Sequence, residues 1–115
     1  MPKVYTTDGY LIEWDKSRIV KQLLRETELA RTIFGREPMD EITAYEIASI
    51  VEDRILQMNP RFMTGAMIRE MVNNVLLEES DLHPEFLLYR NLLTRVGAPV
   101  YDAFQIYCSV SHHHD

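Results

Sequence analysis

The chain has 115 residues, of which 46% are hydrophobic and 26% are charged, and its net charge is −6. This length predicts one domain, and the acidic balance disfavours DNA or RNA as a partner, because binding to those polymers depends on neutralising phosphates. A single cysteine excludes a disulfide scaffold, and with neither a signal-peptide pattern nor an apolar run of about 20 residues we expect a cytoplasmic protein without a membrane partner.

The first predicted element is a β-hairpin over residues 3–14. Two β-rich runs flank Asp8-Gly9, and this pair tolerates the positive φ angles that a two-residue hairpin turn requires. With Asp8-Gly9 as the whole loop, Tyr5 would face Ile12 across the ribbon. A two-stranded ribbon is barely stable alone, so we expect one of its faces to pack on helices.

A first helix is predicted over residues 16–34. Asp15 is its expected N-cap, because the carboxylate can accept hydrogen bonds from the first backbone N–H groups. Apolar residues from Ile19 to Ile33 recur at the spacing of a buried helix face, and Gly35 favours termination there. A hairpin that leads directly into a helix N-terminus also makes a place where a small anion can sit.

The second helix is predicted to open with a capping box formed by Thr43 and Glu46 and to end at Asn59-Pro60. One face of this helix carries all the apolar positions that we expect to be buried. These are Ala44, Ile47, Ala48, Val51 and Ile55.

The remaining chain predicts a short third strand at residues 61–63 and two more helices. Thr64 is the expected cap of the third helix, Pro84 suits the first turn of the fourth, and Gly97 ends it. The predicted fold is therefore α+β and mostly α. It is a four-helix core capped by an N-terminal β-hairpin, which the third strand would extend to a three-stranded sheet. We expect the domain to span residues 1–97 and residues 98–115 to form a tail or the start of a linker.

Motifs for catalysis or metal binding are weak in this sequence. The glycines are isolated, and the chain has no Gly-rich phosphate loop, zinc-protease motif or nucleophile elbow. His112, His113 and His114 are adjacent in the tail and lack the spacing of a folded metal site. We therefore expect no enzymatic activity of the chain alone and no metal site built from its own side chains.

The order of these motifs resembles the ATP-cone, the regulatory nucleotide-binding domain at the N-terminus of many ribonucleotide reductases. The resemblance covers residues 3–95. Residues 89–102 further resemble the passage from cone to catalytic domain in anaerobic (class III) ribonucleoside-triphosphate reductases, so the chain looks like a fragment of such an enzyme or a cone on its own.

The first motif of the family has the form Val-x-Lys-Arg-Asp-Gly. Val4, Asp8 and Gly9 match it, whereas Thr6 and Thr7 stand where the family has Lys and Arg. In relatives those basic residues reach triphosphate oxygens. Threonine hydroxyls can still donate hydrogen bonds, but without the assistance of a charge.

Two further motifs match better. Arg18-Ile19 corresponds to the basic–apolar pair of the first helix, and Ile68-Arg69 to the pair that faces the nucleotide in relatives. Adenine needs a dry, flat slot, and phosphates need N–H groups and cations such as those at the first helix N-terminus, with Lys16 nearby. Together these considerations nominate as nucleotide-binding residues Lys3, Val4, Thr6, Thr7, Trp14, Arg18, Ile19, Lys21, Thr64, Ile68, Arg69 and Arg90.

The resemblance implies an allosteric domain that binds ATP or dATP, together with any nucleotide-bound Mg²⁺, and controls the activity or assembly of a reductase. Its partners would be the nucleotide and either the reductase catalytic domain or other copies of itself.

Three alternatives stay open. The first is a degenerate cone that acts as an oligomerisation or protein-interaction module without binding nucleotide. It is suggested by Thr6-Thr7 and by apolar residues that we expect to be exposed among Met63, Met67, Leu87 and Phe104. The second is a cone from a transcriptional repressor or a small kinase, and the third is an unrelated helical interaction module.

Overall fold

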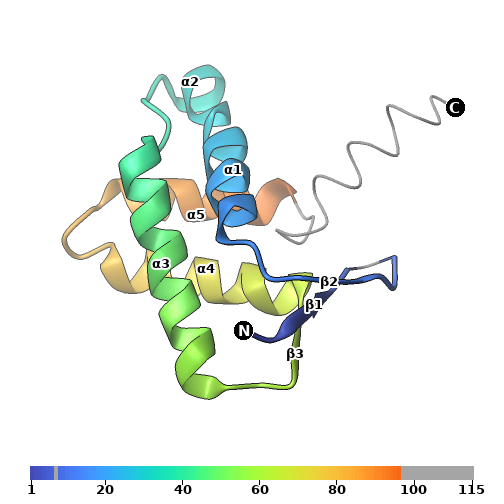
Figure 1. The fold of residues 1–115 in the computed structure, drawn as a ribbon. Coiled ribbons are helices and arrows are strands. Elements are labelled where there is room, and N and C mark those ends of the chain that lie inside the picture. The colour runs from blue at the N-terminus through green and yellow to red at the C-terminus, as the bar shows by residue number, and fades with distance from the viewer. Residues whose placement is uncertain (7, 97–115) are drawn as a thin grey trace, which may run out of the picture.

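A small sheet lies at one end of a group of helices in the computed structural model, which describes residues 1–6 and 8–96 (Figure 1). The strands are β1 (Lys3–Tyr5), β2 (Leu11–Ile12) and β3 (Phe62–Thr64). The helices are α1 (Lys16–Thr27), α2 (Leu29–Phe34), α3 (Glu41–Met58), α4 (Gly65–Glu79) and α5 (Glu85–Val96). The predicted mostly helical α+β fold is confirmed. The predicted ends of the fourth helix and of the domain, at Gly97, lie outside the described residues.

The β1–β2 hairpin forms, but its predicted register is wrong by one residue. Val4 pairs with Ile12, and the loop is three residues long rather than two. The backbone N–H of Gly9 donates to the oxygen of Thr6 at 3.0 Å, and the N–H of Thr6 donates to the oxygen of Tyr10 at 2.9 Å. Gly9 has a φ of 90°, which closes a three-residue loop of the kind that ends in a left-handed glycine.

The third strand is confirmed, and it pairs with β1 in parallel to give the order β2-β1-β3. Val4 lies opposite Met63, and both are fully buried. Tyr5 and Phe62 occupy the other face, where their rings meet edge to face with centroids 5.1 Å apart. The inner face of the sheet therefore joins the core, and the outer face carries exposed aromatic side chains.

The predicted first helix is interrupted, because α1 ends at Thr27 and α2 starts at Leu29. The hydroxyl of Thr27 donates to the main-chain oxygen of Leu23 at 2.7 Å and accepts the N–H of Met39 at 3.1 Å. A threonine that bonds back to the preceding turn favours a bend, and the contact with Met39 comes from tertiary structure. Gly35, with a φ of 62°, is the left-handed residue that ends α2 as predicted.

The N-caps of α1 and α4 are the predicted ones, whereas the N-cap of α3 is not. Asp15 and Thr64 are the N-caps of α1 and α4, as predicted. The predicted Thr43–Glu46 capping box is wrong, because Asp40 caps α3 and accepts the N–H of Thr43 at 2.7 Å. The helix therefore starts three residues earlier than a Thr43 cap would allow, and Asn59 ends it with a φ of 49°.

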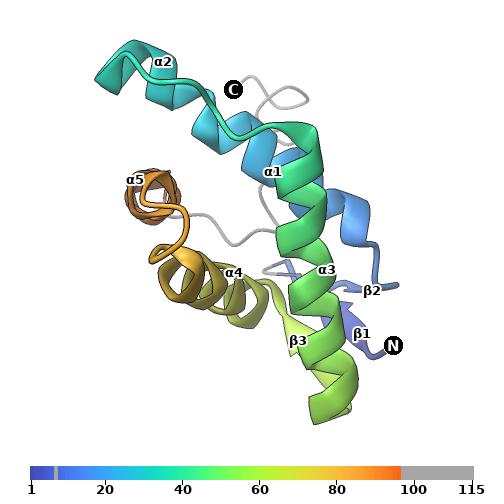
Figure 2. The same ribbon diagram turned by 90° about the vertical axis from the view of Figure 1, so that its left-hand side faces the viewer.

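The four long helices enclose one core. α1 packs on α3 and α5, and α4 packs on the same two helices, so the contacts form a closed ring (Figure 2). All five apolar positions that were predicted to be buried on α3 are buried. Within residues 1–6 and 8–96, no helix combines the length and the apolar character needed to cross a bilayer.

Candidate functional site

One face of α1 is turned toward α4. Arg18, Gln22 and Glu26 recur every four residues, so they lie along the same side of the helix. Glu26 reaches Arg69 of α4, with 3.3 Å between Oε1 and the guanidinium Nη2. Arg18 therefore lies two turns before Glu26, on the side of α1 from which Arg69 is contacted.

Glu26 is the centre of a buried polar network. Its side chain is 2% exposed and that of Arg69 is 11% exposed, and Gln22, also buried, donates a hydrogen bond to the second carboxylate oxygen. Burial raises the pKa of Glu26 to about 7, although Arg69 and Gln22 both act to lower it. A carboxylate in this position changes charge near neutral pH.

Apolar walls lie beside this network. Ile19 of α1 and Ile68 of α4 precede Gln22 and Arg69 in their helices, and both are fully buried in the common core with Val4. Thr64 is half-buried and uses its hydroxyl to cap α4, accepting the N–H of Met67 at 3.1 Å.

Thr6 follows the last residue of β1 and forms hydrogen bonds with Tyr10 across the hairpin. Its side chain is buried, and its hydroxyl accepts the N–H of Tyr10 at 3.1 Å. The hydroxyl thus has a structural partner inside the hairpin. Thr7, the other residue that replaces a basic one of the family motif, lies outside the described residues.

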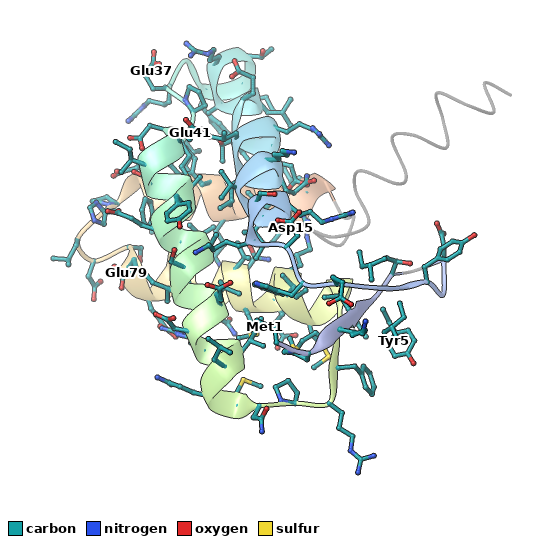
Figure 3. All side chains as sticks on the ribbon, in the orientation of Figure 1. Met1, Tyr5, Asp15, Glu37, Glu41 and Glu79 are labelled. Carbon is teal, nitrogen blue, oxygen red and sulfur yellow. The ribbon has the colours of Figure 1, made fainter. Side chains whose placement is uncertain are left out.

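The N-terminus of α1 carries its predicted cap, Asp15, at the place where a small anion was also expected. The carboxylate of Asp15 accepts the N–H of Ser17 at 3.0 Å and its hydroxyl at 2.7 Å, so an acidic side chain already occupies the place foreseen for an anion. Figure 3 shows Asp15 where the chain passes from the sheet into α1. Lys16 and Lys21 line a groove between α1 and α3 and so lie on another face of the helix from Glu26.

Lys16 and Trp14 are both held by α3. The indole Nε1 of Trp14 donates to Glu52 at 2.7 Å, and the ammonium group of Lys16 lies 3.3 Å from the other oxygen of Glu52. The same ammonium group lies 4.4 Å from the centre of the Tyr45 ring. This cluster fastens the start of α1 to the middle of α3.

The last two nominated cations have protein partners as well. Lys3 pairs with Glu13 across the hairpin. The Nε of Arg90, on α5, donates to the main-chain oxygen of Asn73 on α4 at 3.2 Å. The structure therefore places Arg18 two turns before Glu26, the α1 residue that contacts Arg69, and it places Lys3 on the exposed ribbon.

Comparison with known families decides what kind of domain this is. The model of the ATP cone domain matches residues 2–95. The chain belongs to the ATP-cone family. Searches among curated proteins and among solved structures returned no match. ATP-cone domains are nucleotide-binding, allosteric regulatory domains without catalytic activity of their own.

Two polar residues of this ATP-cone were not predicted as site residues from the sequence. Gln22 and Glu26 are buried between α1 and α4, although neither was nominated. Their burial could have been predicted from their position in the helix. They are four residues apart and lie next to the apolar stripe that includes Ile19 and Leu23. Within the described ranges, no group of three or more metal-ligating side chains occurs, and the three tail histidines lie outside those ranges.

Proposed function

We propose that this ATP-cone binds ATP or dATP on the side of α1 that faces α4. Its occupancy would control the activity or assembly of an anaerobic (class III) ribonucleotide reductase, with residues 98–115 as the start of the linker to the catalytic domain. The observation that carries the proposal is that Glu26 of α1 contacts Arg69 of α4 on the face that also bears Arg18.

The chemistry of these side chains suits a triphosphate. Arginine binds phosphate through charge-assisted and often bidentate hydrogen bonds, and Arg18 and Arg69 come from different helices. Ile19 and Ile68 supply apolar surface for a base. The threonine hydroxyls at positions 6 and 7 and Arg90 on α5 are further proposed contacts, and any Mg²⁺ would arrive bound to the nucleotide.

Regulation requires more than binding. A nucleotide shifts an assembly equilibrium only by the difference in its affinity for the two states. A ligand bound between α1 and α4 would alter the packing of all four long helices, because α1 and α4 each also pack on α3 and α5. We propose that a change in this packing is what the reductase senses.

Calorimetric titration with ATP and with dATP tests the proposal. We expect saturable binding and a loss of affinity of about tenfold or more in Arg18→Ala, because a hydrogen bond to a charged group is worth about 1.5–3 kcal/mol. Arg36→Ala removes the same charge from an exposed loop residue and should leave the affinity unchanged. Flat titrations at millimolar nucleotide would contradict the proposal.

A second candidate function has its own observation, the groove between α1 and α3. Ile42 is 75% exposed and Tyr45 is 54% exposed beside it. The α1 wall carries Lys21 and the α3 wall carries Glu46, so a second copy related by a two-fold axis that runs along the groove would set each basic wall against an acidic one. We propose this face as the contact if the domain acts as an oligomerisation module.

The apolar residues first considered for such a contact divide between surface and core. Met67 and Leu87 are exposed, as expected. Met63 is fully buried, because it lies on the inner face of β3, so the expectation that it is exposed is wrong. Phe104 lies outside the described residues.

A further inference from the structure

The polar network between α1 and α4 contains an acid where the proposed ligand brings negative charge. Glu26 and the proposed phosphate site share one guanidinium, that of Arg69. We infer that Glu26 competes with the nucleotide phosphate for Arg69 and takes up a proton when the nucleotide binds. This inference rests on the function proposed above. Glu26 would then set the affinity of the site and its dependence on pH.

The carboxylate of Glu26 has few hydrogen-bond partners available to it. One carboxylate oxygen accepts from Arg69 and the other from Gln22, and the side chain is 2% exposed. Water therefore offers little compensation if Arg69 turns to another anion. A buried carboxylate without its cation is strongly disfavoured in its ionised form.

The charges around Glu26 are few. Arg69 of α4 is the nearer cation, and Arg25 of α1 acts more weakly. α5 also packs on α1, and it brings to the core the apolar Leu92 and Leu93. Its buried titratable residue, Tyr89, directs its hydroxyl to the main-chain oxygen of Glu37. The face of α3 in the core is apolar.

The exchange is balanced in protons and hydrogen bonds. The bond from Arg69 to Glu26 breaks, and a bond from Arg69 to a phosphate oxygen forms. The carboxylate of Glu26 gains a proton from solvent and remains bonded to Gln22, whose amide can serve a neutral carboxyl group as well. Since the pKa of Glu26 is already about 7 with Arg69 in place, the loss of Arg69 and the arrival of phosphate both raise it further.

The test is a calorimetric titration with ATP in excess Mg²⁺ at pH 6, 7 and 8, in buffers of different ionisation enthalpy. We expect wild-type protein to take up close to one more proton per nucleotide than Glu26→Gln at pH 8. Above the pKa of Glu26 in the unliganded domain, the wild-type affinity should fall by up to about tenfold per pH unit relative to this variant. Comparison with the variant cancels the titration of the nucleotide itself.

Glu70→Gln is the matched control, because it makes the same change on an exposed residue beside Arg69 and should behave as wild type. Carbon-13 NMR titration of Glu26 in the wild-type protein gives a second readout, independent of how well the variant folds. It should show a higher pKa in the presence of ATP.

Two failures are distinguishable. Saturable ATP binding with equal proton uptake in wild type and Glu26→Gln, or a Glu26 pKa that ATP leaves unchanged, overturns the inference and leaves the proposed function intact. Absence of ATP binding in wild type and in both variants overturns the proposed function, and the inference falls with it.

Discussion

Glu26 sets an unusual pH dependence of stability. Burial raises its pKa from the ordinary 4.5 to about 7, so the folded protein holds a proton that the unfolded chain has released. The free energy of unfolding should therefore fall as the pH rises from about 4.5 to about 7, by at most about 1.4 kcal/mol per pH unit. The protonated, neutral form of the Glu26 carboxyl group is therefore the one that favours the folded state.

Urea denaturation at pH 5, 6 and 7 checks this expectation. The free energy of unfolding of the wild type should decrease across the series, and that of Glu26→Gln should change less, because glutamine has no proton to lose. Glu70→Gln should retain the wild-type trend. Equal trends in wild type and Glu26→Gln would show that Glu26 does not titrate in this range.

The capping carboxylates act in the opposite direction and in a lower pH range. The Ser17 hydroxyl lowers the pKa of Asp15, and the backbone N–H of Thr43 lowers that of Asp40, both from 3.8. Their contributions are present above that value and are lost as the pH falls through the lowered pKa. Both carboxylates are exposed, so each contribution is small.

Single residues were predictable where their role is local or periodic. The burial of Ile19 and Ile68 followed from helical spacing, and the capping roles of Asp15 and Thr64 followed from residue type. The pairing of Glu26 with Arg69 joins residues 43 positions apart. No local pattern encodes such a contact, because it depends on how α1 and α4 cross.

Among the helices, most ends were predictable and one interruption was not. Gly35 and Asn59 adopt the left-handed conformation that favours helix termination. The break after Thr27 depends on the backbone of Met39, which the fold brings back to α1. Sequence periodicity cannot detect a break of this kind, because the apolar spacing continues through it.

The attachment of α1 to α3 through Trp14 gives a prediction for these elements. Trp14→Phe keeps an aromatic ring but removes the Nε1 donor to Glu52. We expect a loss of about 1–2 kcal/mol in the free energy of unfolding, since a hydrogen bond to a charged acceptor is lost in a half-buried position.

A double-mutant cycle with Glu52→Ala, measured by urea denaturation, checks the assignment. The two substitutions should cost less together than the sum of their separate costs, because they remove the same contact. Additive effects would show that the hydrogen bond contributes nothing.

For the molecule as a whole, the four-helix core and its capping ribbon were predictable from the order of apolar patterns and caps. The parallel pairing of β1 with β3 was not, because three residues at positions 62–64 carry no information on strand direction. The side of α1 on which each lysine lies was also undetermined until the packing of α3 was known. That packing separates Lys16 and Lys21 from the face of Glu26.

The state of assembly distinguishes the two candidate functions. If the α1–α3 groove joins two copies, size-exclusion chromatography should show a dimer with and without ATP, and Ile42→Glu should convert it to a monomer. Leu82→Glu is the matched control, because Leu82 is 79% exposed and lies in the turn between α4 and α5. A monomer under all conditions would contradict the oligomerisation role of this groove.

The parallel sheet also has a consequence for biosynthesis. β1 is the central strand, yet it leaves the ribosome long before β3, the strand that completes its pairing. Until Thr64 has been translated and released, one edge of β1 has no partner and Val4 lacks the neighbour that covers it. The nascent chain must therefore keep this strand from other pairings while α1, α2 and α3 are being made.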